Sequence, residues 1–257
     1  MSRKRILVAL AIVVVVGGIY TWFFGVQTGC ALIARYNYRK VPEALMVPRP
    51  LSDSSISNAP HRHVSYFGYD FELPWDDVKD QKSKTDGKIR ITAFQSGNAL
   101  WFSVFPPKTL IKGVMKTGQL DSQRFQQLYG AEAFESDFNF HRTMLEITPS
   151  QITPFVSRNK AVTDMMLLLV KTISIPPAAS GIFSIRTPDF EGFQFESTDP
   201  RPFTITDELY SKDGGIDVIF LQKKDGNAPA ISQPEINRVI QSIQKTSAVT
   251  SDAKAHE

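Results

Sequence analysis

The stretch FTITDELYSKDGGIDVIFLQK, from Phe203 to Lys223, contains two β-rich segments on either side of Lys212-Asp213-Gly214-Gly215. Asp-Gly and Gly-Gly pairs adopt the positive φ angles that tight hairpin turns require, so these residues predict a hairpin between strands at 203–210 and 215–223. Two similar segments precede it, at 181–187 and 190–197. The last third of the chain therefore predicts a meander of four antiparallel strands.

A short amphipathic helix is expected after this meander. It begins at Ser232 or Gln233, where Pro234 and Glu235 are typical of a first helical turn. The spacing of its apolar residues predicts that one side faces the core, and these residues are Ile236, Val239, Ile240 and Ile243.

The part of the chain before the meander predicts strands and then helices. Segments 64–73, 88–95 and 99–105 have the composition of strands, and Ser96-Gly97-Asn98 between the last two is typical of a hairpin turn. Between Pro107 and Ile173 the apolar spacing predicts several helices. The most regular pattern runs from Arg158 to Ile173.

The order of strands, helices, strands and helix predicts an α+β fold. We expect a largely antiparallel sheet of six or seven strands with helices packed on it. All of these elements fall in one expected domain at residues 61–245, followed by a small polar tail at 246–257.

Three segments of this domain resemble the PsbP-like fold of photosystem II extrinsic subunits. They are YDFELPW at Tyr69–Trp75, the late meander, and EINRVIQSI at Glu235–Ile243. The resemblance covers the two ends of the domain and implies an α/β sandwich in which residues 108–173 form a helical insertion. Because a shared fold does not carry function, no functional residue is transferred from that family.

The N-terminus predicts a membrane anchor. Arg3, Lys4 and Arg5 precede a charge-free apolar run from Ile6 to Phe24. As a helix this run reaches about 28 Å, which is enough to cross a hydrocarbon core. The positive-inside rule then predicts a cytoplasmic tail at 1–5 and a body outside the cytoplasm, held at the cytoplasmic (inner) membrane by a single transmembrane signal anchor. The Pro-rich residues 25–60 are expected to form a tether.

Two alternatives to a retained anchor stay open. Gly29-Cys30-Ala31 also fits a small-residue site for cleavage of a secretory signal. Cys30 is also a candidate for acylation in a bacterial lipoprotein, although Gln27 stands where such signals usually carry Leu.

The charge distribution argues against nucleic-acid binding. The chain has a formal charge of +3, but residues 61–245 carry 21 Lys and Arg against 22 Asp and Glu. A basic stripe is therefore missing from the body. Since Cys30 is the only cysteine, an intramolecular disulfide is impossible and the core alone must stabilise the fold.

His61 and His63 are the candidate metal ligands. Alternate residues of a strand share a face, so two imidazoles can bind one metal there. A third ligand would have to come from elsewhere, and Asp70, Glu72 and His141 are guesses. The alternative to a metal site is that His61 and His63 are simply polar residues at the start of a strand.

Two further groups of residues are candidates for binding, and each also has an ordinary structural interpretation. Asp76, Asp77 and Asp80 can coordinate a hard cation, but the lysines between them are typical of a solvated loop. Several aromatic residues can line a ligand pocket or simply fill a core, and these are Phe190, Phe193, Phe195 and Phe203.

The sequence contains no G-x-S-x-G, P-loop, H-E-x-x-H, C-x-x-C or dinucleotide glycine motif. We therefore assign no catalytic residue and no cofactor. The first hypothesis is a non-catalytic binding or assembly domain with an envelope protein as partner. The second is a domain that binds a small ligand or lipid between its sheet and the inserted helices. The third is a metal-dependent enzyme around His61 and His63.

Overall fold

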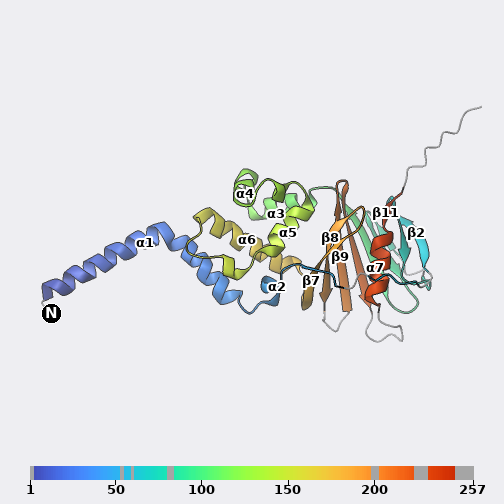
Figure 1. The fold of residues 1–257 in the computed structure, drawn as a ribbon, viewed down its shortest axis with the longest axis horizontal. Helices are drawn as coiled ribbons and strands as arrows, with labels where there is room; N and C mark the ends of the chain where they lie inside the picture. Colours follow the sequence, from blue (N-terminus) through green and yellow to red (C-terminus); the bar gives the residue numbers. More distant parts are fainter. Residues whose placement is uncertain are drawn as a thin grey trace, which may run out of the picture. The chain divides into compact units, whose positions relative to one another are not determined.

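A computed structural model describes residues 3–52, 55–58, 61–79, 84–197, 203–222 and 231–246, with the backbone alone at 3–13, 19 and 203. Contacts divide the chain into two compact units (Figure 1). The helical unit contains Met1–Arg49, Lys108–Ile182 and Phe195–Ser197. The sheet unit contains Pro50–Pro107, Phe183–Gln194 and Thr198–Glu257. The expected polar tail lies outside the described residues from 247 onward.

The helical unit contains the helices that the apolar spacing predicted, with small shifts at their ends. Lys108 has a positive φ of 60°, so the first inserted helix begins at Thr109 rather than at Pro107. Ser136 and Ser157 cap two of the inserted helices by accepting hydrogen bonds from Asn139 N and Lys160 N. The helices are α1 (Arg3–Asn37), α2 (Pro42–Leu45), α3 (Thr109–Gly118), α4 (Ser122–Tyr129), η2 (Glu132–Phe134), α5 (Asp137–Glu146), η3 (Pro149–Gln151) and α6 (Arg158–Ser174).

An aromatic and aliphatic cluster forms the core of the helical unit. Phe125 of α4 stacks on Phe140 of α5, with ring centroids 5.0 Å apart. Leu167 and Leu168 of α6 are fully buried in the same cluster, which also includes Ala34 of α1. The second half of α1 is therefore part of this core.

The predicted transmembrane signal anchor at 6–24 is wrong. Within the residues that were described, no helix is both long enough and apolar enough to cross a membrane. The apolar run does not end at a helix end, because α1 continues without a break to Asn37 through a segment that contains Gln27 and Arg35. In that segment Ala31 and Ala34 are buried. We expected membrane contact and an extracytoplasmic position because of this anchor. Without the anchor, both expectations lose their support.

The strands form two sheets. The larger has eight strands in the order β1-β7-β8-β9-β10-β6-β5-β4, and the smaller has the order β11-β3-β2. The α+β class is confirmed, but the large sheet exceeds the six or seven strands that we predicted, because strands as short as β1 and β4 leave no periodic pattern. The strands are β1 (Arg49–Pro50), β2 (Arg62–Tyr66), β3 (Tyr69–Leu73), β4 (Lys84–Asp86), β5 (Ile89–Ala93), β6 (Ala99–Phe105), β7 (Ala179–Arg186), β8 (Glu191–Ser197), β9 (Phe203–Ser211), β10 (Gly214–Gln222) and β11 (Gln244–Lys245).

The hairpin at Lys212-Asp213 is confirmed and sets the register of β9 and β10. Ser211 pairs with Gly214, which has a φ of 140° that favours glycine. Antiparallel pairing then continues through Glu208 opposite Asp217 to Phe203 opposite Gln222. β10 also pairs with β6, and β6 with β5, both antiparallel.

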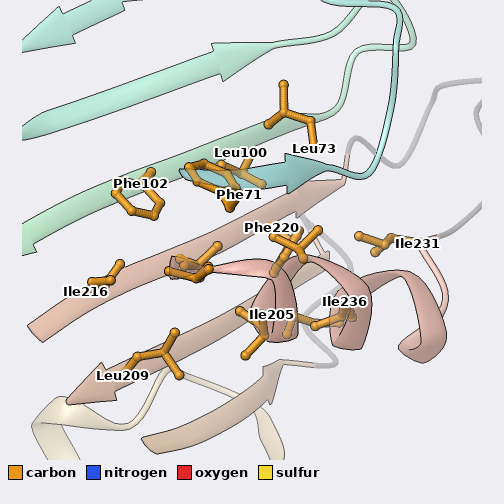
Figure 2. Packing of buried hydrophobic residues seen from close by; sticks show 14 of the residues in the cluster. Phe71, Leu73, Leu100, Phe102, Ile205, Leu209, Ile216, Phe220, Ile231 and Ile236 are labelled. Carbon is orange, nitrogen blue, oxygen red and sulfur yellow. The ribbon is translucent and has the colours of Figure 1, made fainter. Parts of the chain in front are cut away.

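One face of these strands packs against β3 and α7 (Gln233–Ser242), and Figure 2 shows this core. Phe71 of β3 stacks on Phe102 of β6, with ring centroids 4.7 Å apart and planes 10° apart. The apolar side that we predicted for α7 is confirmed, because its residues Ile236, Val239 and Ile240, and Ile243 just after the helix, are all buried.

Candidate functional site

His61 and His63 lie near the carboxylate of Glu72, which already forms an ion pair with Arg238. On β2 and β3, His63 is opposite Glu72, and their Nε2 and Oε1 atoms are 3.4 Å apart. Arg238 of α7 also donates to the Glu72 carboxylate, and this hydrogen bond is the main reason that the pKa of Glu72 is lowered. Over the described ranges, no group of three or more His, Cys, Asp or Glu residues could hold a metal ion. The metal site at these histidines stays a prediction.

The other candidate metal ligands include Asp70 of β3 and Asp77 in the loop that follows it. Asp70 accepts a hydrogen bond from Ser65. Asp77 accepts one from the Ser96 backbone N–H at 2.7 Å, while Asp80 lies outside the described residues. His141 belongs to α5 in the helical unit, where burial lowers its pKa to about 3.

Cys30 lies within α1, where it is half-buried and packs against the core of the helical unit. Burial raises the pKa of its thiol, so the thiolate form is disfavoured at neutral pH. Its acylation stays a prediction.

The aromatic residues of the meander behave as core residues. Phe190, Phe193 and Phe195 are at most 4 % exposed. The side chain of Phe203 lies outside the described residues. A ligand pocket built by these rings therefore has no support.

The helical unit contains a cleft of about 500 Å³ that the sequence did not indicate. Three segments bound it: the end of α3 with the turn that follows, α4, and the first half of α6. Its lining residues are Gly118, Gln119, Leu120, Asp121, Arg124, Phe125, Arg158, Asn159, Val162, Thr163 and Met166. We call this space the helical cleft.

The helical cleft combines an apolar lining with two guanidinium groups. Leu120, Phe125, Val162 and Met166 supply the apolar part. Arg124 and Arg158 are exposed, and the one acid among the lining residues is Asp121. Because the Asp121 carboxylate accepts the Arg124 backbone N–H at 2.8 Å as the cap of α4, it is held at that helix end.

A buried polar cluster fixes α4 against α6 beside the cleft. Tyr129 of α4 donates a hydrogen bond to Oδ1 of Asp164, whose side chain is 1 % exposed. Lys160 Nζ donates to the same oxygen at 3.0 Å and lies 4.5 Å from the centroid of the Tyr129 ring. Burial and the hydrogen bond to Asp164 raise the pKa of Tyr129, so its hydroxyl stays protonated and donates.

Lys171 joins α6 to two other helix ends of the unit. Its fully buried ammonium donates to the carbonyl oxygens of Met46, Leu145 and Ile147 at 2.5, 2.6 and 2.8 Å. Met46 follows α2, while Leu145 and Ile147 lie at the end of α5. Burial lowers the pKa of Lys171 to about 8, but all three protons have acceptors, so its role is structural.

The lining of the cleft offers few groups for nucleophilic chemistry. Thr163 is the only hydroxyl among the lining residues, and it donates to the Asn159 carbonyl at 2.8 Å. Neither histidine nor cysteine is present in the described lining, so the pairing of a nucleophile with a base is missing there. The arginines and the apolar residues are groups that bind and orient a ligand.

Comparison with family models, with curated proteins and with solved structures finds no match to this chain. The resemblance to the PsbP-like fold therefore stays a prediction, and the function has to be argued from the residues themselves.

Proposed function

We propose that this protein is a non-catalytic binding protein whose helical cleft takes a small amphipathic anion. The observation that carries the proposal is the combination of Arg124 and Arg158 with an apolar lining in one cleft of about 500 Å³. This volume is within the range of about 300–1,000 Å³ that ligand sites occupy.

The chemistry of the lining selects the class of ligand. A guanidinium group matches a carboxylate or phosphate through paired hydrogen bonds, so the arginines favour an anionic head. Arg158 and Asn159 also belong to the first turn of α6, where backbone N–H groups carry partial positive charge. Leu120, Val162 and Met166 then favour an aliphatic chain attached to that head.

Calorimetric titration of the full chain tests this proposal with two ligands that share one chain length. Decanoate carries an anionic head and decylamine a cationic one. We expect decanoate to bind with a stoichiometry of one and at least about tenfold more tightly, because hydrogen bonds to charged groups contribute about 1.5–3 kcal/mol. Equal affinities for the two ligands would remove the anionic class.

Variants of the two arginines locate the binding. The double variant Arg124→Gln with Arg158→Gln removes both guanidinium groups and is expected to weaken decanoate binding by about ten- to a hundredfold. Arg142→Gln is the matched control, because Arg142 is an exposed residue of the same unit that does not line the cleft. Unchanged binding by the double variant would place the ligand elsewhere.

A further inference from the structure

The eight-stranded sheet has a second face in the sheet unit, opposite the face that packs on α7. The pairing register places Ile89, Ser103, Asp217 and Glu208 side by side in one row across β5, β6, β10 and β9. Since alternate residues of a strand share a face, the next row on one side is Ile91, Trp101, Ile219 and Thr206. We call the surface that carries these rows the open face.

A third row lies on the other side of the two carboxylates. Phe105 and Tyr210 flank Gly215 there, with their ring centroids 6.0 Å apart. A Cβ at Gly215 would lie 2.1 Å from the Phe105 ring, so this ring lies over the glycine. The carboxylates of Asp217 and Glu208 therefore lie between two apolar rows.

The apolar residues of the open face belong to neither hydrophobic core. Ile91, Trp101 and Ile219 are half-buried and, in the part of the chain that the structure describes, lie outside both buried clusters. A half-buried tryptophan in such a place is typical of a surface that a partner covers.

The two carboxylates make the open face acidic. Ser103 donates to Asp217 at 3.1 Å and Tyr210 donates to Glu208 at 2.9 Å. Burial raises the pKa of Glu208 to about 7 and that of Asp217 to about 6, and the charge of Asp217 adds to the shift of Glu208. Carboxylates whose charge is disfavoured by their surroundings gain most from a cation brought against them.

Charged residues of β4 do not offset these carboxylates. Asp86 extends the acidic row, because it is opposite Ile89. Lys84 is opposite Ile91 in the neighbouring row, three strands from β10, which corresponds to about 14 Å. At that separation the charge of Lys84 is largely screened.

We propose that the open face binds a short basic amphipathic segment of a partner protein, with a Lys or Arg against Asp217 and Glu208 and apolar residues against the rows on either side. Its charge disfavours two other occupants. A second copy docked face to face would bring the acidic rows together, and an anionic lipid surface would be repelled. The four strands span about 14 Å, a width that matches one helix or one extended segment with side chains.

Fluorescence anisotropy of the full chain with two labelled peptides tests this proposal, which is independent of the helical cleft. One peptide is amphipathic and built from Leu and Lys, and the other has Glu at each Lys position. We expect the Lys peptide to bind at least tenfold more tightly than the Glu peptide and to weaken as salt rises. Equal binding of the two peptides, or spermidine binding as tightly as the Lys peptide, would overturn the proposal.

Isosteric variants locate the peptide. Asp217→Asn with Glu208→Gln is expected to lower the affinity for the Lys peptide at least tenfold, while Asp76→Asn, in an exposed loop of the same unit, leaves it unchanged. Carbodiimide cross-linking should join the peptide's lysines to Asp217 or Glu208. Cross-links confined to other carboxylates, or a dimer that the double variant strengthens, would contradict the proposed occupant.

Discussion

Glu208 of β9 lies directly opposite Asp217 of β10, so two carboxylates meet on neighbouring strands of one sheet. Like charges in directly opposite positions destabilise a sheet, and burial adds to the cost. The fold is therefore expected to be more stable without these two charges. A pair with such a cost to stability is typical of residues that act in binding.

The pair makes stability depend on pH in a defined direction. The folded pKa values of about 7 for Glu208 and about 6 for Asp217 lie above the ordinary values of 4.5 and 3.8. Between about pH 4 and 7 the folded state thus binds more protons than the unfolded state, and the contribution of the pair to stability falls as pH rises.

Removing both charges is expected to reverse this loss. Asp217→Asn with Glu208→Gln should be more stable than the wild type at pH 8 by about 1–3 kcal/mol, and the difference should vanish near pH 4. Urea unfolding at several pH values measures it, with Asp76→Asn as the control. A double variant that is less stable than wild type at pH 8 would contradict the account.

Replacement of Lys171 by Met is expected to destabilise the helical unit. Met matches the shape of the lysine stem but leaves the carbonyls of Met46, Leu145 and Ile147 without their donor. Even after the lysine's own burial cost is relieved, we expect a loss of about 2–4 kcal/mol. Urea unfolding at pH 7 measures it, and Lys112→Met on the exposed side of α3 is the control, which should change little.

Tyr129→Phe removes one hydroxyl from the polar cluster beside the cleft. Asp164 is buried and then keeps Lys160 as its one described hydrogen-bond donor. We expect a loss of about 1–3 kcal/mol in the free energy of unfolding. Tyr36→Phe, at a side chain that is 79 % exposed, should cost almost nothing in the same thermal or chemical unfolding measurement. Equal effects of both variants would mean that the cluster adds no stability.

Substitution of Phe71 tests the core packing shown in Figure 2. Its ring is 1 % exposed and stacked on Phe102, so Phe71→Ala is expected to cost about 3–5 kcal/mol. Phe155→Ala deletes the same ring where it is 90 % exposed and should lie within about 0.5 kcal/mol of the wild type. Calorimetric unfolding of the two variants separates a core ring from a surface ring.

Two glycines are expected to respond to alanine in opposite directions. A Cβ at Gly192 would lie 2.1 Å from the Glu208 carbonyl oxygen, so Gly192→Ala must push β8 away from β9 and destabilise the protein. Gly113 is inside α3 with nothing within 4 Å of its missing Cβ, and Gly113→Ala should stabilise by about 0.5–1 kcal/mol. Thermal unfolding of both gives the comparison, and a stabilised Gly192→Ala would contradict the close approach.

Local patterns predicted the elements with strong signals. The turn at Lys212-Asp213, the buried side of α7 and the helix that begins at Arg158 all depend on residues a few positions apart. The pairing of Glu208 with Asp217 could also have been predicted, because counting outward from a two-residue turn places these two residues opposite each other.

The features that escaped prediction depend on distant residues. The helical cleft joins residues near 120 to residues near 160, and no local spacing links Arg124 to Arg158. The apolar run at 6–24 predicts a membrane-spanning element, whereas it is the first part of a helix that reaches Asn37. Lys171 is a charged residue on the apolar side of α6. Its burial could have been predicted, because Leu167 and Leu168 lie on the same side of the helix.

Photoaffinity labelling of the full chain with a diazirine derivative of decanoate tests the central claim most directly. We predict that the label appears in the segments 118–125 and 158–166, that excess decanoate prevents it, and that Arg124→Gln with Arg158→Gln abolishes it. Labelling that is confined to other segments, or that excess decanoate does not reduce, would contradict a ligand site in the helical cleft.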